Sequence, residues 1–598
     1  MSIFQRNMAA LQHQDPKLAV LVQKCPLHID MRLEAARNSQ PTLRVRGSYL
    51  HSPYDPGKEG REWADNCSQS LKAKEPVTVF GHGLGYHLIP LAERGIHGTV
   101  IEPDLAVFRL AMESIDLTHV LDRFSVIVET EEEKLRRHQK IFCGELLCHP
   151  ASARLHDELC SGLRSYGEVL KTVRQGGLKV LVVDPIYGGS LPAAHHSVQA
   201  LRDLGHEVVG FASEAFADGM RLLEKFRYPE NRQGARQGLA SLLSQSIELA
   251  VEEFSPDLVL ALAQAPLLPE TLAKLRGAGI PVAFWFVEDC RTLTYWQETA
   301  PHYSWFFGIQ KGSFPTELAA IGAGGYHYLP TAAAPEVHMP VALTPEERAG
   351  FGSPLSFVGA GYHNRLRFFR GLVDYPFKIW GSDWPLELPL APLIQNNAGR
   401  VDTADCVRIF NASAINLNLH SSTWHEGVVP DGDFVNPRTF EIAACGAFQL
   451  VDRRSLLDEL FADDELETFS SLPELREKID HYMQDEPGRR RLADKGRQRV
   501  LAEHTYRHRM EELLAVMLLR FPQLAERRQE RHQRRVGLLA ELGEQAGLSD
   551  LLARVPLGEA GRVEDIYQAI GTGEGSLSRA ERIFLIMQNT PVVRGGEG

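Results

Sequence analysis

The sequence lacks the features that mark membrane, secreted and nucleic-acid-binding proteins. None of its apolar runs approaches the roughly 20 residues that a helix needs to span a bilayer. The start of the chain has no cationic segment followed by a long apolar core, so we expect no signal peptide. The net charge of −13 argues against a general nucleic-acid-binding protein. We therefore expect a protein without a transmembrane segment and without a nucleic-acid partner.

Cysteine is also scarce. The eight cysteines show no spacing typical of a disulfide framework, which favours a reducing, cytoplasmic location. Cys143, Cys148 and His149 have side chains that can bind zinc, but no second pair of ligands follows them, so we expect no metal there. A hydrophobic content of 44% and a charged content of 24% are those of an ordinary globular protein.

The first nucleotide-binding pattern follows a lead-in, residues 1–75, that we expect to be mostly helical. A strand at residues 77–80 precedes a glycine loop, a short helix and a second strand that ends in an acid. The residues expected at a ligand are Gly81, Gly83, Gly85 and Glu102. The G-x-G-x-G spacing is closer to that of S-adenosylmethionine-dependent methyltransferases than to the dinucleotide fingerprint, although Val79 stands at their usual acidic position. The alternative is a Rossmann-like domain that binds no ligand or an unrelated one.

The same region resembles a known family. The segments that carry the resemblance are YDPGKEG (54–60), VFGHGLGYHL (79–88) and VIEPD (100–104). They are similar to the front portion of the motility-associated-factor type of proteins, which act in bacterial flagellin glycosylation. The resemblance covers about residues 1–150 and implies no particular catalytic residue.

The middle of the chain alternates strands with helices, which predicts a doubly wound sheet. The strands are expected at residues 179–184, 207–211, 257–261, 281–286, 304–308 and 326–330. Glu288 and Asp289 follow the fourth of these strands, and two adjacent carboxylates raise the pKa of one of them, as suits a general base. The alternative is a helix cap with an ion pair to Arg291. His195 or His196 is a second candidate base.

A second α/β unit follows a Pro- and Ala-rich linker at residues 331–344. Its first strand, residues 355–359, leads through a loop into a helix that begins at Arg365. Glycine and arginine at the start of a helix favour a phosphate site.

The stretch from Phe434 to Asp452 is the most informative in this unit. It predicts a polar loop with Asn436 and Arg438, a short helix that Gly446 ends, and a buried strand. Glu441, near the start of that helix, can accept both hydroxyl groups of a ribose, while the helix N-terminus and Arg438 hold phosphates. The alternative is a glutamate that only complements the helix dipole.

Two consecutive α/β units joined by a linker, with a phosphate loop and a ribose-type acid in the second, predict a GT-B glycosyltransferase. Residues 178–520 also resemble the CgeB-like (spore maturation protein type) glycosyltransferases. The segments that carry this resemblance are SFVGAGYHNRLRFF (356–369), INLNLH (415–420), VNPRTFEIAACGAFQLVD (435–452), HTYRHRMEELL (504–514) and, more weakly, FWFVEDCR (284–291).

The resemblance implies roles for individual residues. Glu441 would bind the ribose of a nucleotide-sugar donor, and Arg365 and Arg438 would neutralise its diphosphate without a metal ion or a tightly bound cofactor. The residues that would shape or line the donor pocket are His363, Asn364, Asn418, Asn436 and Gly446. The residues that would supply the base are Asp289 or Glu288 and then His196. This chain departs from the family pattern in an insert at residues 421–433, which would form a lid or read the sugar.

We therefore predict an α/β protein with a Rossmann-like N-terminal domain, a GT-B pair of Rossmann-like domains and a helical tail. The expected parts are residues 1–150 (N-terminal domain), 151–177 (helical connector), 178–335 (acceptor domain), 336–521 (donor domain) and 522–598 (tail). The expected function is transfer of a sugar from a nucleotide-sugar to a protein, such as flagellin, or to a surface glycan. The alternatives are a non-enzymatic motility or envelope scaffold and a bifunctional protein with a methyltransferase-like N-terminal domain. The stereochemical outcome stays open.

Overall fold

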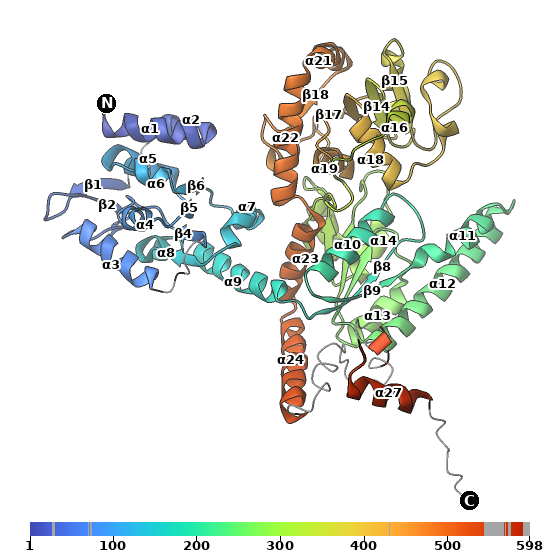
Figure 1. Ribbon diagram of the computed structural model, residues 1–598, viewed down its shortest axis with the longest axis horizontal. Coiled ribbons are helices and arrows are strands. Elements are labelled where there is room, and N and C mark those ends of the chain that lie inside the picture. The colour runs from blue at the N-terminus through green and yellow to red at the C-terminus, as the bar shows by residue number, and fades with distance from the viewer. Residues whose placement is uncertain are drawn as a thin grey trace, which may run out of the picture. The chain divides into compact units, whose positions relative to one another are not determined.

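The computed structural model of the chain (Figure 1) falls into two compact units, residues 1–171 and 172–598. The residues that the structure describes are 1–26, 30–69, 71, 75–429, 431–542, 567, 570–571 and 576–589. Within these ranges, every helix is either too short or too polar to cross a membrane.

Unit 1 contains two sheets. The larger is parallel, with the strand order β6-β5-β4-β7, and the smaller is antiparallel, with the order β1-β2-β3. The strands are β1 (Met31–Ala35), β2 (Pro41–Val45), β3 (Ser48–Tyr49), β4 (Val77–Phe80), β5 (Gly98–Glu102), β6 (Phe124–Val128) and β7 (Leu146–Cys148). The helices are α1 (Ile3–Gln14), α2 (Pro16–Lys24), α3 (Pro56–Ser68), α4 (Leu88–Glu93), α5 (Leu105–Ser114), α6 (Thr118–Leu121), α7 (Glu132–Arg137), α8 (Pro150–Leu155) and α9 (Asp157–Arg174).

The expectation of a mostly helical lead-in is wrong for residues 31–49. β2 and β3 form a hairpin in which Val45 pairs with Ser48. The two residues between them, Arg46 and Gly47, have φ angles of 47° and 82°. Positive φ at both central residues is the conformation of a type I′ hairpin turn. An arginine at the first of these positions is not a strong turn signal, which explains why the sequence does not predict the hairpin.

The first sheet of unit 2 is parallel throughout, with the order β13-β12-β11-β10-β8-β9. Its strands are β8 (Lys179–Val183), β9 (Glu207–Phe211), β10 (Leu258–Leu262), β11 (Val282–Phe286), β12 (Trp305–Gly308) and β13 (Tyr326–Tyr328). β8, β10 and β11 are buried along their whole length, as expected for continuous apolar strands covered on both faces. The helices are α10 (Leu191–Asp203), α11 (Ala217–Glu224), α12 (Pro229–Phe254), α13 (Pro269–Gly277), α14 (Trp296–Thr299) and α15 (Phe314–Ala320).

The second sheet of unit 2 is also parallel, with the order β15-β14-β16-β17-β18. Its strands are β14 (Leu355–Val358), β15 (Phe377–Trp380), β16 (Ile415–Asn418), β17 (Gln449–Asp452) and β18 (Glu467–Phe469), of which the sequence did not predict the last. The helices are α16 (Pro345–Phe351), α17 (His363–Phe368), α18 (Thr403–Ala412), α19 (Pro437–Ala444), α20 (Leu457–Leu460), α21 (Leu472–Gln484) and α22 (Glu486–Glu503). Two doubly wound parallel sheets in succession confirm the predicted α/β fold class.

The helix α23 (Tyr506–Arg520) leaves the second domain of unit 2 and packs on α10 of the first. Glu512 lies 2.8 Å from Nε2 of His327 on β13, and Arg509 donates to the carbonyl oxygens of Pro330 (2.8 Å) and Thr331 (3.2 Å). These polar contacts join the two domains on the side of the linker. The chain continues with α24 (Gln523–Leu542), and α27 (Arg579–Asn589) follows later. Residues 543–566, 568–569, 572–575 and 590–598 of the predicted helical tail lie outside the described residues.

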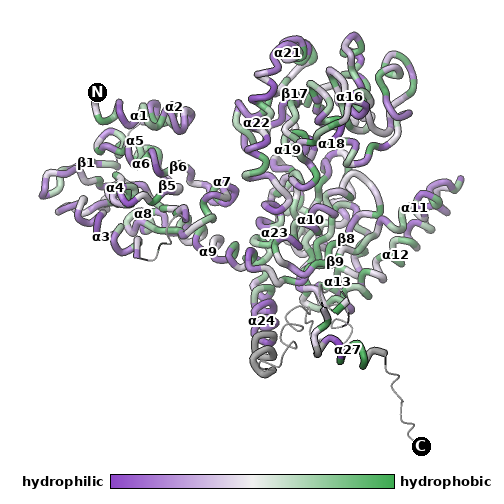
Figure 2. The backbone as a smooth tube through the Cα atoms, viewed as in Figure 1, coloured by the Kyte–Doolittle hydropathy of each residue, from purple (hydrophilic) through white to green (hydrophobic). Residues whose placement is uncertain are grey.

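Hydropathy separates the buried strands from the outer helices in Figure 2, where α22 and much of α24 are hydrophilic. The charge-rich α24 nevertheless makes specific contacts with the first domain. Arg531 forms an ion pair with the buried carboxylate of Asp257, and Arg528 donates to the carbonyl oxygen of Gly176. Part of this charged surface is therefore used to attach the helix.

Candidate active site

The two domains of unit 2 share a cavity of about 460 Å³. Its lining follows four strands, β11 and β12 of the first sheet and β16 and β17 of the second. The polar side chains that line it include Asp289, Arg291, Gln310, Lys311, Ser422, His425, Asp431, Asp433 and Arg454. Open parallel sheets bind ligands at the carboxyl ends of their strands. The cavity lies at the carboxyl ends of strands from both sheets.

Asp289 is the predicted base that lines this cavity. Its Oδ1 accepts hydrogen bonds from the Gln310 side chain (3.2 Å) and the Arg291 amide (3.0 Å), and its Oδ2 accepts one from the Thr292 hydroxyl (2.6 Å). These donors fix the carboxylate at the end of β11. An oriented carboxylate at a cavity wall can accept a proton from a hydroxyl group placed beside it.

Glu288 does not share this environment. Its two oxygens accept hydrogen bonds from Gln264 (2.5 Å) and from the Tyr295 hydroxyl (2.9 Å), residues that line a different cavity of about 430 Å³. Burial raises the pKa of Glu288, so the physical cause is desolvation and not the neighbouring carboxylate that the sequence suggested. The ion pair expected for Arg291 is formed with Glu317, at 2.6 Å.

Arg454 is a cavity residue that the sequence analysis missed. It follows β17, is 3% exposed, and donates to the carbonyl oxygens of Phe434 (3.2 Å) and Val429 (3.4 Å). Burial lowers the pKa of its guanidinium, and the charges of Asp452 and Asp289 oppose that change. A buried arginine near Asp289 provides positive charge at the wall of the cavity.

The insert at residues 421–433 also lines the cavity, through residues that include Ser422, Trp424 and His425. Its start is fixed by Asn364 of α17. The Asn364 side chain accepts from the Ser422 amide (2.9 Å) and donates to the carbonyl oxygen of His420 (2.7 Å). The side chain of Trp424 is 64% exposed. The start of the insert is therefore held in place by hydrogen bonds, and the insert adds an exposed aromatic side chain to the cavity region.

Glu441 lies on α19, which begins after Asn436, a residue whose side chain accepts from the Thr439 amide (3.1 Å). Glu441 is buried and forms an ion pair with Arg438. Although burial raises the pKa of Glu441, the charges of Arg438 and His338 lower it by more, so the net shift is downward. Glu441 is therefore ionised at neutral pH, and a hydroxyl ligand would compete with Arg438 for its oxygens.

Residues of the first domain and of the linker reach Glu441. Nε2 of His338, in the linker, lies 4.0 Å from a Glu441 oxygen. His196 of α10 packs against His338 and against Tyr506, with ring centroids 5.4 Å and 5.1 Å apart. Burial lowers the pKa of His196 to about 4, and its Nε2 has no hydrogen-bond partner among the described residues. The predicted ribose acid and the third predicted base thus belong to one interdomain cluster.

Arg365 joins two loops of the second sheet. It donates from Nε (2.9 Å) and Nη2 (2.7 Å) to the carbonyl oxygen of Leu419, and from Nη1 to that of Ala360 (2.9 Å). Burial lowers its pKa to about 10, so the guanidinium remains charged. His363, two residues earlier on α17, is exposed. Arg365, which was predicted to bind phosphate, therefore donates from these nitrogen atoms to carbonyl oxygens of the chain. It contributes a buried positive charge at the switch point between β14 and β16.

The predicted pocket residues Asn418 and Asn436 bond to each other, with Nδ2 of Asn436 2.8 Å from Oδ1 of Asn418. Asn418 also donates to the Thr439 hydroxyl (2.9 Å). His420, just beyond β16, lies 2.6 Å from Asp452 and accepts from the Asn436 amide at 2.9 Å. These bonds set the position of α19 against the strand ends. Their role in the structure is to hold the start of the helix that carries Arg438 and Glu441.

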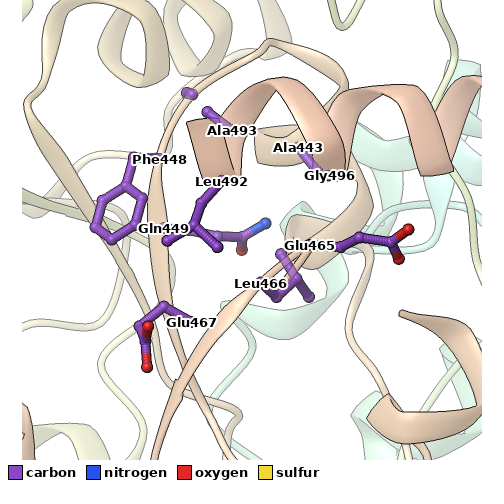
Figure 3. Close-up of a pocket in the computed structure, with 10 residues that line it drawn as sticks. Ala443, Phe448, Gln449, Glu465, Leu466, Glu467, Leu492, Ala493 and Gly496 are labelled. Carbon is purple, nitrogen blue, oxygen red and sulfur yellow. The ribbon is translucent and has the colours of Figure 1, made fainter. Parts of the chain in front are cut away.

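The other face of α19 is tightly packed. Figure 3 shows Ala443 beside Gly496 of α22, with Gln449, Glu465 and Leu466 around a recess of about 10 Å³. That volume is about the least that a water molecule needs. Gly446 ends the helix with a φ of 64°, the left-handed conformation typical of a C-terminal glycine. The side of α19 that faces α22 is therefore closely packed, while Glu441 lies near His338 of the linker.

The glycine loop of unit 1 is occupied by protein groups. Glu102 accepts hydrogen bonds from the amides of His82 (2.9 Å) and Gly83 (3.1 Å), and burial raises its pKa to about 7. A side chain at Gly81 would meet Ser152, at Gly83 His51 and at Gly85 Leu117. The predicted ribose acid of this loop therefore binds the loop itself, and the close approach that the glycines permit is made by neighbouring side chains.

Three histidines of unit 1 form a cluster that sequence spacing does not reveal. His51, His87 and His149 are almost fully buried, border a cavity of about 340 Å³ and have ligand atoms within 4.8 Å of one another. Burial lowers the pKa of each well below 6.5. The rings of His87 and His149 are stacked, with their centroids 4.3 Å apart. A second group with the spacing of a metal site consists of Asp184, His195 and Glu214.

Residues 364–515 match a protein family described as glycosyl transferase-like. This match covers most of the second domain of unit 2 and agrees with the expected glycosyltransferase class. The chain is also similar to the spore protein CgeB of Bacillus subtilis (strain 168), with 26% identity over 215 residues, 34% of this chain and 66% of that protein. The expected resemblance to CgeB-like proteins is thereby confirmed over about a third of the chain.

Two further proteins are similar to parts of the chain. An uncharacterized protein of Treponema pallidum (strain Nichols) is 36% identical over 129 residues, 20% of this chain and 44% of that protein. The structure of Anabaena HepE in complex with UDP-glucose has a TM-score of 0.39 and 14% identity, covering 57% of this chain and 99% of that one. The chain spans 66% and 44% of the lengths of the two curated relatives. The resemblance of residues 1–150 to motility-associated factors stays a prediction.

Proposed function

We propose that the protein transfers a sugar from a nucleotide-sugar donor, which the second domain of unit 2 binds, to an acceptor held by the first. The observation that carries this proposal is the shared cavity of about 460 Å³, lined from the strand ends of both sheets. Sugar transfer requires donor and acceptor to meet in one orientation, and a cavity with a wall from each domain provides for that.

Glu441 is proposed to bind the donor ribose. Its carboxylate is ionised, buried and paired with Arg438 on the preceding turn. A ribose offers two hydroxyl donors, which a carboxylate accepts as charge-assisted hydrogen bonds. Arg438, released from part of this pairing, would then be available to a phosphate. Arg438 is therefore paired with Glu441 before the donor binds, and part of its charge becomes available to the phosphate on binding.

The departing diphosphate is proposed to be stabilised by arginines, without a metal ion. Arg454 lines the cavity, and Arg365 contributes a buried charge behind the loops after β14 and β16. Fixed positive groups in a site of low dielectric stabilise a developing negative charge strongly. Arg454 is an addition to the arginines that the sequence suggested.

Asp289 is proposed as the base that accepts the acceptor's proton. Among the three predicted candidates, it is the one that lines the cavity. Glu288 is bonded to Tyr295 and Gln264 beside another cavity, and His196 is buried within the interdomain cluster. We further propose a protein acceptor, such as flagellin, or a surface glycan, and a cytoplasmic location. The acceptor class rests on the resemblance of residues 1–150, and the location rests on cysteine usage.

Turnover of a panel of nucleotide sugars, with release of the nucleoside diphosphate as readout, tests the proposal. We expect one donor to be consumed, and Glu441→Gln to weaken its binding. Glu477→Gln, an exposed glutamate on α21, is the matched control and should leave binding unchanged. Absence of both turnover and nucleotide binding across the panel would overturn the proposal and favour a scaffold.

A further inference from the structure

Two cysteines of unit 1 place their sulfur atoms in contact. The thiol of Cys160 donates to the sulfur of Cys148 across 3.2 Å. A disulfide bond is about 2.05 Å long, so the two atoms need to approach by only about 1.1 Å to form one. We propose that Cys148 and Cys160 are a redox modification site, which a hydroperoxide converts into an intramolecular disulfide.

The surroundings of Cys148 favour its thiolate. Nη2 of Arg164 lies 3.3 Å from its sulfur, on the side chain of the next turn of α9 after Cys160. The hydrogen bond from the Cys160 thiol, followed by the charge of Arg164, lowers the pKa of Cys148 to about 6, although burial acts in the other direction. The same hydrogen bond raises the pKa of Cys160. The pair thus contains one thiolate, which attacks oxidants, and one thiol that can resolve the product.

Regular elements hold both sulfur atoms. Cys148 is the last residue of the edge strand β7, and Cys160 lies in the first turns of α9. The short helix α8 and the residues around it connect them. Because both residues are anchored, their proximity does not depend on the sampling of a loose loop. A disulfide would attach the start of α9 covalently to the edge of the sheet.

The oxidation balances in two steps. The Cys148 thiolate attacks one oxygen of the hydroperoxide, the O–O bond breaks, and Cys148 becomes a sulfenic acid as the alkoxide or hydroxide leaves and takes a proton. The Cys160 sulfur then attacks the sulfenyl sulfur of Cys148, forming the S–S bond and releasing water. Both sulfur atoms are oxidised and the two peroxide oxygens are reduced, so no further reactant is needed.

The other cysteines have different surroundings. Cys290 and Cys445 are buried, and burial raises the pKa of each, as for inert structural thiols. Cys143 is exposed and provides an accessible comparison within the same unit. The pattern predicts oxidation at Cys148 and not a general oxidation of thiols.

Treatment of the full chain with hydrogen peroxide, followed by peptide mapping, tests the proposal. We expect loss of two thiols and a disulfide-linked peptide pair that contains Cys148 and Cys160. In Cys160→Ser the reaction should stop at a sulfenic acid on Cys148, which dimedone captures. Cys143→Ser, the matched control, should form the same disulfide at the same rate. A disulfide that links Cys148 to Cys67, or preferential oxidation of Cys143, would overturn the proposal.

The pH dependence of alkylation provides a measurement on the unsubstituted chain that requires no oxidation. The iodoacetamide rate at Cys148 should have its midpoint near pH 6. At that pH it should exceed the rate of an ordinary exposed thiol about tenfold, after allowing for the lower nucleophilicity of a less basic thiolate. A rate at Cys148 that still rises above pH 8, as at an ordinary thiol, would contradict the assignment. Circular dichroism of Cys160→Ser establishes that this variant is folded before its sulfenic acid is measured.

Discussion

Unit 1 and the second domain of unit 2 both place an acidic residue and a glycine near the ends of parallel strands, but they use them differently. In unit 1, Glu102 accepts the amides of its own glycine loop. In unit 2, Glu441 pairs with one arginine beside residues of the neighbouring domain. The first acid completes a closed loop, whereas the second stands at an interdomain site.

A short motif therefore specifies the path of the backbone but not the group that lies against it. Glycines allow close approach by any group, and in unit 1 the groups are the side chains of Ser152, His51 and Leu117. In unit 2 the strand ends of two sheets leave a cavity instead. Whether the space beside such a motif is filled or left as a cavity depends on side chains that are distant in the sequence.

The largest effect is expected from Asp289→Asn, at the cavity between the two domains of unit 2. The substitution keeps the size of the side chain and its hydrogen bond to Gln310, but removes the basicity. If Asp289 accepts the acceptor's proton, kcat should fall about 10²–10⁴-fold with little change in donor KM. Steady-state kinetics with the donor found in the panel provide the measurement. Glu288→Gln, next to it but outside the cavity, is the matched control, and an equal loss in that variant would contradict the assignment.

A smaller effect is expected from Glu441→Gln. The amide can still accept one hydroxyl but loses the charge assistance, so donor KM should rise about 10–100-fold, while kcat changes less. Calorimetry with the nucleoside diphosphate separates binding from chemistry. If the affinity is unchanged while the thermal stability of unit 2 falls, then Glu441 serves only to pair with Arg438.

Much of the parallel framework could be predicted from the sequence, because β10 and β11 are continuous apolar runs and β8 is one after Lys179. Such runs are covered on both faces and have few alternative structures. β18 was missed, because a strand of three residues gives no periodicity to read. The hairpin of β2 and β3 was missed because its turn depends on an unusual conformation of Arg46.

The site was harder to predict than the fold. The sequence identified Glu441 and Arg438, which are three residues apart on one helix and therefore adjacent. It could not distinguish Asp289 from Glu288, since successive residues beyond a strand point to different surroundings. It missed Arg454, whose position depends on carbonyl oxygens of the insert and of Phe434. Contacts of this kind arise only when the chain has folded.

The closed loop of unit 1 can be compared with the helix end of unit 2 through two glycine substitutions. A Cβ at Gly83 would lie 2.5 Å from Nε2 of the buried His51, at a φ of 50°. We expect Gly83→Ala to destabilise unit 1 by about 2–4 kcal/mol, the sum of backbone strain and overpacking. Gly446→Ala meets only Arg497 at 3.3 Å and Pro340 at 3.5 Å, and should cost about 1 kcal/mol.

Hydrogen exchange of peptides from β4 and from α19 measures the two costs separately. Sugar turnover should be retained in Gly83→Ala at temperatures where unit 1 is folded. Loss of S-adenosylmethionine binding in this variant, with binding in the unchanged chain, would instead show that the loop receives a ligand.

The smallest expected effect is a pH dependence that distinguishes the two units. His51, His87 and His149 have folded pKa values well below 6.5, so the unfolded chain binds more protons as the pH falls below 6.5, and unit 1 loses stability. Glu102 acts in the opposite direction. Its folded pKa of about 7 lies above the ordinary 4.5, so its contribution is largest at low pH and is lost as the pH rises through 7.

Between pH 7 and pH 5.5 the three histidines should therefore destabilise unit 1, and proton uptake by Glu102 should offset part of that loss. Glu102→Gln keeps an acceptor for the loop amides but cannot take up the proton. The acid destabilisation of unit 1 should therefore be larger in this variant, as measured by hydrogen exchange of β4 and β5 at the two pH values. An unchanged pH dependence would mean that Glu102 stays ionised in its loop, and the contrast with the ionised Glu441 of unit 2 would then disappear.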